Sequence, residues 1–498
     1  MRQGPGETTE PHQEAAGQGS QARAGEVSIF ANAASLMVSR LAVAAMGWSG
    51  TVLIVRHLSV ANWGRFSFVF GLLGMMSVVS SMANPRVVFR ELANDDGRLA
   101  GTYVLLRLAL GVLGYAVAIS FVAIGHYPPV VLRAVLIAGL TLVIANSASG
   151  YNVIFEFRMK LTSMAVAATL GQAAQLVLTI VLALMHSSLV LFTVPAVLCE
   201  VVAIAWKLYR LPKHPALHYG FLWHQWIELL KLSIPLALGG ALSTLYYNLD
   251  TVMLSKMQTF RAVGIYGISY KFAGIVTTVD VSMTPALYPI LVRYWPEEGD
   301  RFRRVTERTA RLFFVIGALV IAEFTIFSAR AIALLYGHNY VIGANAARLV
   351  VASECVGFFS TLAVVALVSV NRNVVYPVVA LGGLILNLGI NLWVIPRWSY
   401  MGAAWATLIT EVAVALCLWV PMKRATGMRL MGIGPVLKVL LCSGVAVGTS
   451  LGIWQVAPWP AAGAAGAVVY VIALSITRVG DGGLKSIVTL DDKQAATT

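Results

Sequence analysis

Charge is scarce in this chain. Asp, Glu, Lys and Arg make up only 12% of its 498 residues, whereas hydrophobic residues make up 58%. A soluble protein of this length would carry about twice that fraction of charge. The shortage excludes an ordinary soluble domain, and the repeated long apolar runs predict a polytopic membrane protein made of α-helices.

Cysteine is also rare. The chain has four cysteines, all within apolar runs and none at metal-ligand spacing, so we expect small buried side chains. The sequence contains no phosphate-binding loop, metal-ligand cluster or nucleophile elbow. The acidic pair Asp95-Asp96 is typical of a turn and helix cap. We therefore expect a protein that is not an enzyme and that needs no cofactor or metal.

Acidic residues are outnumbered, 22 against 36 basic ones, which gives a net charge of +14. The basic residues lie mostly in short loops, and loops rich in them alternate with loops that are poor in them. By the positive-inside rule, this pattern predicts that both termini are cytoplasmic. Orientation in a membrane explains the charge, so we expect no nucleic-acid partner. The alternation also favours an even number of helices.

The lengths of the apolar runs predict about fourteen membrane helices. The first residues have no apolar core typical of a signal peptide and are expected to be disordered. The predicted parts are a cytoplasmic tail over 1–26, a six-helix lobe over 27–209, a cytoplasmic linker over 210–227, a second six-helix lobe over 228–425, an extra helix pair over 433–478 and a cytoplasmic tail over 479–498.

An internal repeat supports two lobes. The stretch SVANWGRFSFVFGLLG resembles RAVGIYGISYKFAGIV, and their alignment places Trp63-Gly64 on Tyr266-Gly267 and Gly71 on Gly274. A parallel duplication of a six-helix lobe would give this match. The alternative is chance similarity of apolar sequence. We predict an all-α fold with two pseudo-symmetric six-helix lobes around a central cavity, plus a C-terminal helix pair.

Ionisable residues inside apolar runs are functional candidates, because charge within a membrane is costly. Tyr247 and Asp250 share one face of a predicted helix, and the next helix carries Tyr270 and Asp280 on one face and Lys271 beside it. These two polar stripes predict the wall of a hydrated cavity. The alternative is helix packing through small and hydroxyl residues.

Further polar positions extend the candidate cavity. They are Arg40 in the first helix, Gln172 and Gln175 in the fifth, and Asn387 and Asn391 in the eleventh.

Carboxyl groups inside apolar runs are candidates for ion coupling, because such a group can carry a proton. The five positions are Asp250, Asp280, Glu323, Glu354 and Glu411. Proton coupling, sodium coupling and uncoupled transport all remain open.

Three stretches carry a family resemblance. They are NLDTVMLSKM followed by GIYGISYKFAGIV, LSVANWGRFSFVFGLL near the start, and NLGINLWVIPRWSYMGAAWATLITEV. They resemble Wzx-type polysaccharide flippases of the multidrug/oligosaccharidyl-lipid/polysaccharide (MOP) superfamily. The resemblance implies a multi-pass protein of the bacterial inner membrane. It would translocate undecaprenyl-diphosphate-linked oligosaccharides by alternating access, for O-antigen, capsule or exopolysaccharide assembly.

The implied substrate assigns roles to the cations. Arg40 and Lys271 are candidates to contact the diphosphate, and the alternative is that each pairs with a carboxylate such as Asp250 or Asp280. The implied partners are membrane lipids, a polysaccharide polymerase and export machinery.

Other functions remain as alternatives. A MATE-type drug or cation antiporter would have a smaller, more acidic and more aromatic pocket, and a lipid II flippase would differ only in its sugar. A membrane polysaccharide polymerase or glycosyltransferase is less favoured.

Overall fold

The computed structural model describes residues 38–85, 87–88, 98–158, 160–211, 219–428 and 432–477. Within these ranges the chain forms helices and no strands. Twelve helices are long and apolar enough to cross a membrane, and the bent pair Trp223–Ile234 and Ala237–Met257 makes up to thirteen. The helix Val375–Thr426 is two helices merged across a kink at Ser399. Counting it as two brings the described residues to at most fourteen spans, which agrees with the predicted number of about fourteen, and the all-α class is confirmed.

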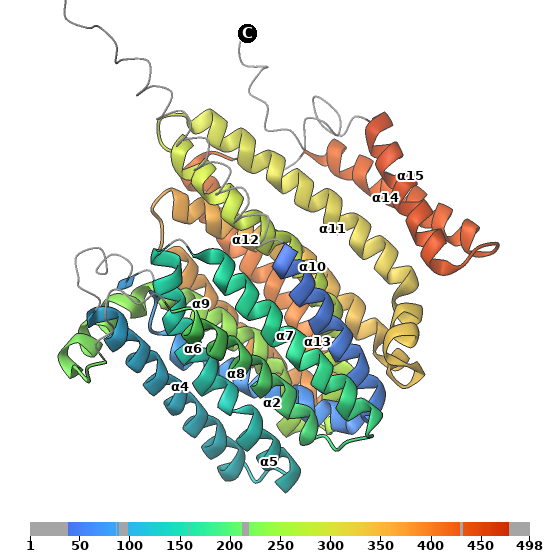
Figure 1. Ribbon diagram of the computed structural model, residues 1–498. Helices are drawn as coiled ribbons and strands as arrows, with labels where there is room; N and C mark the ends of the chain where they lie inside the picture. Colours follow the sequence, from blue (N-terminus) through green and yellow to red (C-terminus); the bar gives the residue numbers. More distant parts are fainter. Residues whose placement is uncertain are drawn as a thin grey trace, which may run out of the picture. The chain divides into compact units, whose positions relative to one another are not determined.

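The first described helix is Val38–His57. The later elements are α2 (Val60–Ser81), α4 (Arg98–Ile124), α5 (Pro129–Ala138), α6 (Leu140–Phe157), α7 (Leu161–Leu184), η1 (Leu191–Thr193), α8 (Val194–Tyr209), α9 (Trp223–Met257), α10 (Phe260–Tyr294), α11 (Gly299–Tyr336), η2 (His338–Gly343), α12 (Ala344–Ser369), α13 (Val375–Thr426), α14 (Ile433–Trp454) and α15 (Trp459–Thr477). Figure 1 shows these elements in sequence colours.

The chain divides into two compact units. The first contains the described residues within 1–54, 83–116 and 136–230, and the second those within 55–82, 117–135 and 231–498. The units do not follow the chain order, since α2 groups with the second unit although it lies in the predicted first lobe. The lobe boundaries taken from the repeat stay a prediction.

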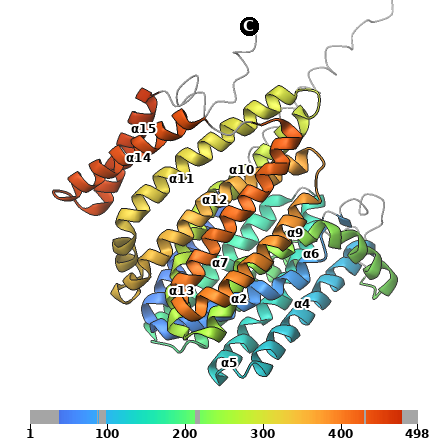
Figure 2. The ribbon, with the colours of Figure 1, turned by 180° about the vertical axis from the view of Figure 1, so that it is seen from behind.

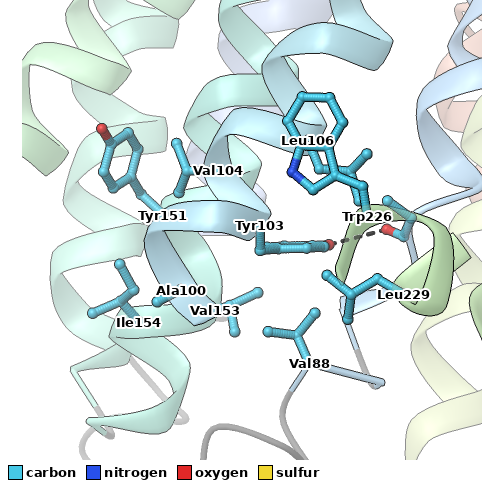
Figure 3. Close-up of a cluster of buried hydrophobic side chains, with 11 residues drawn as sticks. Val88, Ala100, Tyr103, Val104, Leu106, Tyr151, Val153, Ile154, Trp226 and Leu229 are labelled. Carbon is cyan, nitrogen blue, oxygen red and sulfur yellow. Dashed lines mark hydrogen bonds between the residues drawn. The ribbon is translucent and has the colours of Figure 1, made fainter. Parts of the chain in front are cut away.

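The first unit has an apolar core between α4, α6 and the start of α9. Figure 3 shows Tyr103 of α4 among Val88, Val153 and Leu229. Its hydroxyl donates a hydrogen bond of 3.0 Å to the Ala83 carbonyl. A buried tyrosine needs such a partner for its polar end, because an unpaired hydroxyl in an apolar core costs free energy.

In the second unit, α2 packs closely against α10. A Cβ atom added to Gly64 would lie 1.7 Å from the Phe260 carbonyl oxygen, and one added to Gly264 would lie 2.2 Å from the Val60 carbonyl oxygen. Small residues allow two helix backbones to approach this closely. The two copies of the sequence repeat therefore meet at their glycines.

The extra helix pair also belongs to the second unit. In both views, α14 and α15 lie side by side along α11 (Figures 1 and 2). The Tyr470 hydroxyl donates to the Val315 carbonyl at 2.8 Å, and the Ser450 hydroxyl donates to the Glu323 carboxylate at 2.9 Å. These two bonds and an apolar cluster around Val439 and Ala446 dock the pair.

Candidate functional site

A cavity of about 360 Å³ lies between α9, α10, α12 and α13 in the second unit. We call it the acidic cavity, because the carboxyl groups of Asp280, Glu354 and Glu411 line it. Four tyrosines and seven Ser or Thr residues share the lining: Tyr246, Tyr247, Tyr270, Tyr376, Ser243, Thr277, Thr284, Ser353, Ser360, Thr361 and Thr407. Among the described residues that line it there is no Lys or Arg.

Each carboxylate of the acidic cavity accepts a hydrogen bond from a hydroxyl group. Tyr247 donates to Glu354 at 2.9 Å, and Ser360 donates to Glu411 at 2.7 Å. Thr361 donates to Asp280 at 2.7 Å. Helices α9 and α12 supply these donors, so the packing of the helices fixes where the carboxylates lie.

A second polar group lies beside the cavity around Asp250, which is 1% exposed. Its Oδ2 accepts hydrogen bonds from Tyr266 at 2.7 Å and from Thr407 at 2.6 Å. Its Oδ1 accepts one from Asn391 at 2.7 Å, and Asn391 also donates to Asn387 at 2.9 Å. We call these five residues the Asp250 cluster. Neutral donors from α10 and α13 thus satisfy a buried carboxylate of α9.

The Asp250 cluster adjoins the acidic cavity. Thr407 belongs to the cluster and lines the cavity, and the Tyr270 hydroxyl lies 3.4 Å from Asp250 Oδ2. Two buried amide atoms of the cluster, Nδ2 of Asn387 and Oδ1 of Asn391, have no hydrogen-bond partner among the residues described. The cluster therefore has donor and acceptor capacity beyond the bonds it makes.

The two candidate cations are not among the residues that line the acidic cavity. Lys271 of α10 is half-buried, with its Nζ 5.7 Å from the centre of the Trp63 ring. Arg40 of the first described helix is exposed. Neither forms an ion pair with any described residue, so the alternative of pairing with Asp250 or Asp280 gains no support from this part of the chain.

The remaining candidates lie elsewhere. Gln172 and Gln175 are half-buried on α7 in the first unit, where the Gln172 amide faces Gly47 of the first described helix. Glu323 of α11 lies against Ser450 and Gly466 of the extra helix pair and does not line the acidic cavity. Tyr247, Tyr270, Asp280, Glu354 and Glu411 are the candidates that the cavity brings together.

Sequence reasoning missed several partners of these residues. Thr407 contacts Asp250, Ser360 and Tyr246 contact Glu411, and Thr361 contacts Asp280. One usable signal was present, since Thr407 and Glu411 are four residues apart and share a helix face. The other partners depend on which helices pack together, which a single sequence does not encode locally.

The described residues form only helices, and twelve or thirteen of these are long and apolar enough to cross a membrane, so the chain is a multi-pass membrane protein. Residues 53–345 match the family model described as "Polysaccharide biosynthesis protein". The match covers more than half of the chain, which therefore belongs to the polysaccharide biosynthesis protein family. No curated protein matches it at the sequence level.

Several solved structures share the fold. Lipid II flippase MurJ in an inward closed conformation aligns with a TM-score of 0.74 and 14% identity, covering 89% of this chain and 98% of that one. An inward-facing MATE multidrug resistance transporter of the MOP superfamily aligns with a TM-score of 0.64 and 12% identity, covering 77% and 96%. The Vibrio cholerae MATE transporter VcmN in its bent form aligns with a TM-score of 0.51 and 14% identity, covering 80% and 98%. The chain has a MurJ- and MATE-like fold.

Proposed function

We propose that this chain is a flippase. It moves undecaprenyl-diphosphate-linked oligosaccharides across the bacterial inner membrane for exopolysaccharide, capsule or O-antigen assembly. The observation that carries the proposal is the polysaccharide biosynthesis family match over residues 53–345 in a chain with the MOP fold. A polysaccharide polymerase and the export machinery would receive the translocated unit.

The polar head group of the substrate is the main barrier to its translocation. Sugar hydroxyls and a diphosphate lose their water when they enter hydrocarbon, and each unpaired group costs free energy. A hydrated route lined by hydroxyls and amides lowers that barrier while the polyprenyl tail stays in lipid. This task is one of binding and alternating access, so the proposal assigns no catalytic residue.

The negative charge of the acidic cavity suits it to binding a coupling ion and not to binding the diphosphate of the substrate. Carboxylates repel a diphosphate, so Asp280, Glu354 and Glu411 are unsuited to contact it. Arg40 of the first unit and Lys271 of the second are separate candidates for contact with the diphosphate, and we assign the coupling ion to the acidic cavity and the Asp250 cluster. Gln172 and Gln175 of the first unit are assigned to the sugar, because amides can both donate and accept hydrogen bonds.

The Asp250 cluster suits a proton or a sodium ion. Carboxylate, amide and hydroxyl oxygens are the ligands that hard cations prefer. Turning the Asn391 amide would bring its unpartnered oxygen toward the Asp250 carboxylate. A proton on Asp250 would neutralise the carboxylate as a bound sodium ion would, because either ion cancels its charge.

One observation favours a second candidate. The acidic cavity is small, acidic and rich in tyrosine, which is the pocket predicted for a MATE-type drug or cation antiporter. A lipid II flippase remains a variant of the main proposal with another sugar.

Deleting the gene and analysing lipids tests the proposal. Radiolabelled sugar nucleotides would be supplied to permeable cells, and polyprenyl-linked oligosaccharides would be extracted. We expect the complete repeat unit to accumulate on its lipid, facing the cytoplasm, while polymer disappears. Expression of the wild-type chain should restore polymer, and a Lys271→Glu variant at equal membrane level should not. Unchanged lipids and polymer would overturn the proposal in favour of drug efflux.

The orientation is part of the proposal. We place both termini in the cytoplasm of a cell with the chain in its inner membrane, because the basic loops fall on the side of the termini. A reporter that is active only outside the cytoplasm, fused after residue 477, should stay inactive. The same reporter inserted at Gly125, before α5, should be active.

A further inference from the structure

A second cavity of the second unit is an apolar cleft. It has a volume of about 660 Å³ and lies between α11, α12, α13 and the start of α14. Its walls are mainly aromatic and aliphatic and include Phe314, Val356, Phe359, Val412, Leu416 and Trp419. The volume lies within the range of about 300–1,000 Å³ typical of ligand pockets.

The apolar cleft is separate from the acidic cavity. On α12, Glu354 and Thr361 line the cavity, whereas Phe359 lines the cleft; on α13, Glu411 lines the cavity and Leu416 the cleft. The two spaces therefore use different faces of the same helices. Leu416 is 63% exposed, so the cleft opens at the apolar surface of a membrane protein.

One unpaired charge lies on the wall of the cleft. Glu307, Arg311 and Phe314 follow at helical spacing on the face of α11 that lines it. Glu307 already has an interaction partner. The half-buried Arg311 makes no hydrogen bond or ion pair with any residue in the described ranges. The lining thus combines apolar side chains with one guanidinium group, that of Arg311, which has no partner among the described residues.

We propose that the apolar cleft binds an anionic phospholipid of the surrounding bilayer. Arg311 pairs with its phosphate, and one acyl chain lies against Phe359, Leu416 and Trp419. Arginine binds phosphate through paired N–H groups, and basic pockets between membrane helices hold anionic head groups. The inference rests on the placement of the chain in a membrane and goes beyond its transport activity.

The surroundings favour a resident lipid over the transported one. The walls of the cleft carry no sugar-binding array, and the polar route faces the other side of α12 and α13. Gly432, Pro435 and Val436 at the start of α14 form one wall. A bound chain would therefore fill the space between the extra helix pair and the helices of the acidic cavity.

Tryptophan quenching tests this proposal, because Trp419 lies in the cleft. The purified full-length protein in a non-ionic detergent would be titrated with phosphatidylglycerol that carries brominated acyl chains, with the unbrominated lipid as blank. We expect a saturable quenching component that Trp419→Phe removes. Arg311→Gln should weaken the apparent affinity roughly tenfold, which corresponds to the loss of one charge-assisted hydrogen bond. Arg304→Gln, an exposed change on the same helix outside the cleft, should behave as wild type.

Three further outcomes would overturn the proposal. If Trp419→Phe keeps the whole saturable component, the lipid binds elsewhere. If brominated phosphatidylcholine binds as tightly and Arg311→Gln has no effect, the contact is one of unselective annular lipid. If undecaprenyl phosphate displaces phosphatidylglycerol at far lower concentration, the cleft belongs to the transported lipid. Thermal unfolding in lipid-free detergent must show that each variant is folded, and polymer restored by Arg311→Gln would separate this result from the proposed flippase function.

Discussion

The hydroxyl of Tyr266 lies 2.7 Å from the Oδ2 atom of Asp250, deep in the second unit. This bond joins α10 to α9, and Thr407 brings α13 to the same oxygen atom. Tyr266→Phe removes one donor from a buried carboxylate and should lower the free energy of unfolding by about 1–3 kcal/mol. Thermal unfolding in detergent measures the change. Tyr340→Phe is a matched control, because Tyr340 is 3% exposed and its hydroxyl has no partner among the described residues; equal losses in both variants would contradict the prediction.

Asp250→Asn keeps the shape of the side chain but removes its charge and its capacity to bind a cation. We expect a folded protein in which transport no longer responds to a proton or sodium gradient. Uptake of labelled lipid-linked oligosaccharide into inverted vesicles, with and without each gradient, measures this response. A variant that keeps the full gradient response would exclude Asp250 from coupling.

The glycine contact between α2 and α10 predicts a steric effect on activity. Gly64→Ala places a Cβ atom within 1.7 Å of the Phe260 carbonyl, so the two helices must separate. We expect complementation of a deletion strain to fall well below wild type. Gly274→Ala is the control on α10, because a Cβ atom added there meets nothing within 4 Å. Equal activity of the two variants would show that the close contact is dispensable.

Gradient-driven transport should depend on the carboxylates of the acidic cavity more strongly than on Glu323. Glu354→Gln removes a cavity charge that Tyr247 orients, and we expect a roughly tenfold loss of gradient-driven transport, about 1.4 kcal/mol. Glu323→Gln should stay within about twofold of wild type by the same measure, because that carboxylate lies between α11 and α14. The reverse order would place the coupling path beside the extra helix pair.

The bond between Ser450 and Glu323 should stabilise the docking of the extra helix pair. Ser450→Ala leaves the Glu323 carboxylate without its donor and should cost about 1–3 kcal/mol of stability. Thr449→Ala, at a half-buried neighbour whose hydroxyl bonds only within its own helix, should change little. Thermal unfolding of the two variants side by side checks the difference.

Much of the fold could be predicted from the sequence. Apolar run length is a local property, so it predicted the all-helical class and a number of spans close to the number found in the described residues. The repeat singled out Gly64, which lies at the contact of α2 with α10. The grouping of α2 with the second unit was not foreseen, because it depends on contacts between distant helices.

The candidate site was predictable only in part. Helical spacing identified Asp250, Asp280 and the two asparagines, because intramembrane charge and amides stand out in apolar runs. Their partners did not stand out, because Thr361 and Thr407 are also ordinary packing residues of membrane helices. The role of each threonine depends on the carboxylate to which it donates a hydrogen bond, and tertiary packing determines which carboxylate that is.

Helices α12 and α13 separate the acidic cavity from the apolar cleft, because different faces of each helix line the two spaces. One face meets carboxyl and hydroxyl groups, and another meets the hydrocarbon-like walls of the cleft. Adjacent residues of a helix point about 100° apart, so a rotation by one residue would turn a carboxyl group away from the acidic cavity and toward the apolar cleft. Rotation of either helix about its own axis is therefore unfavourable, and insertion of a single residue into its middle should be far more damaging than most substitutions there.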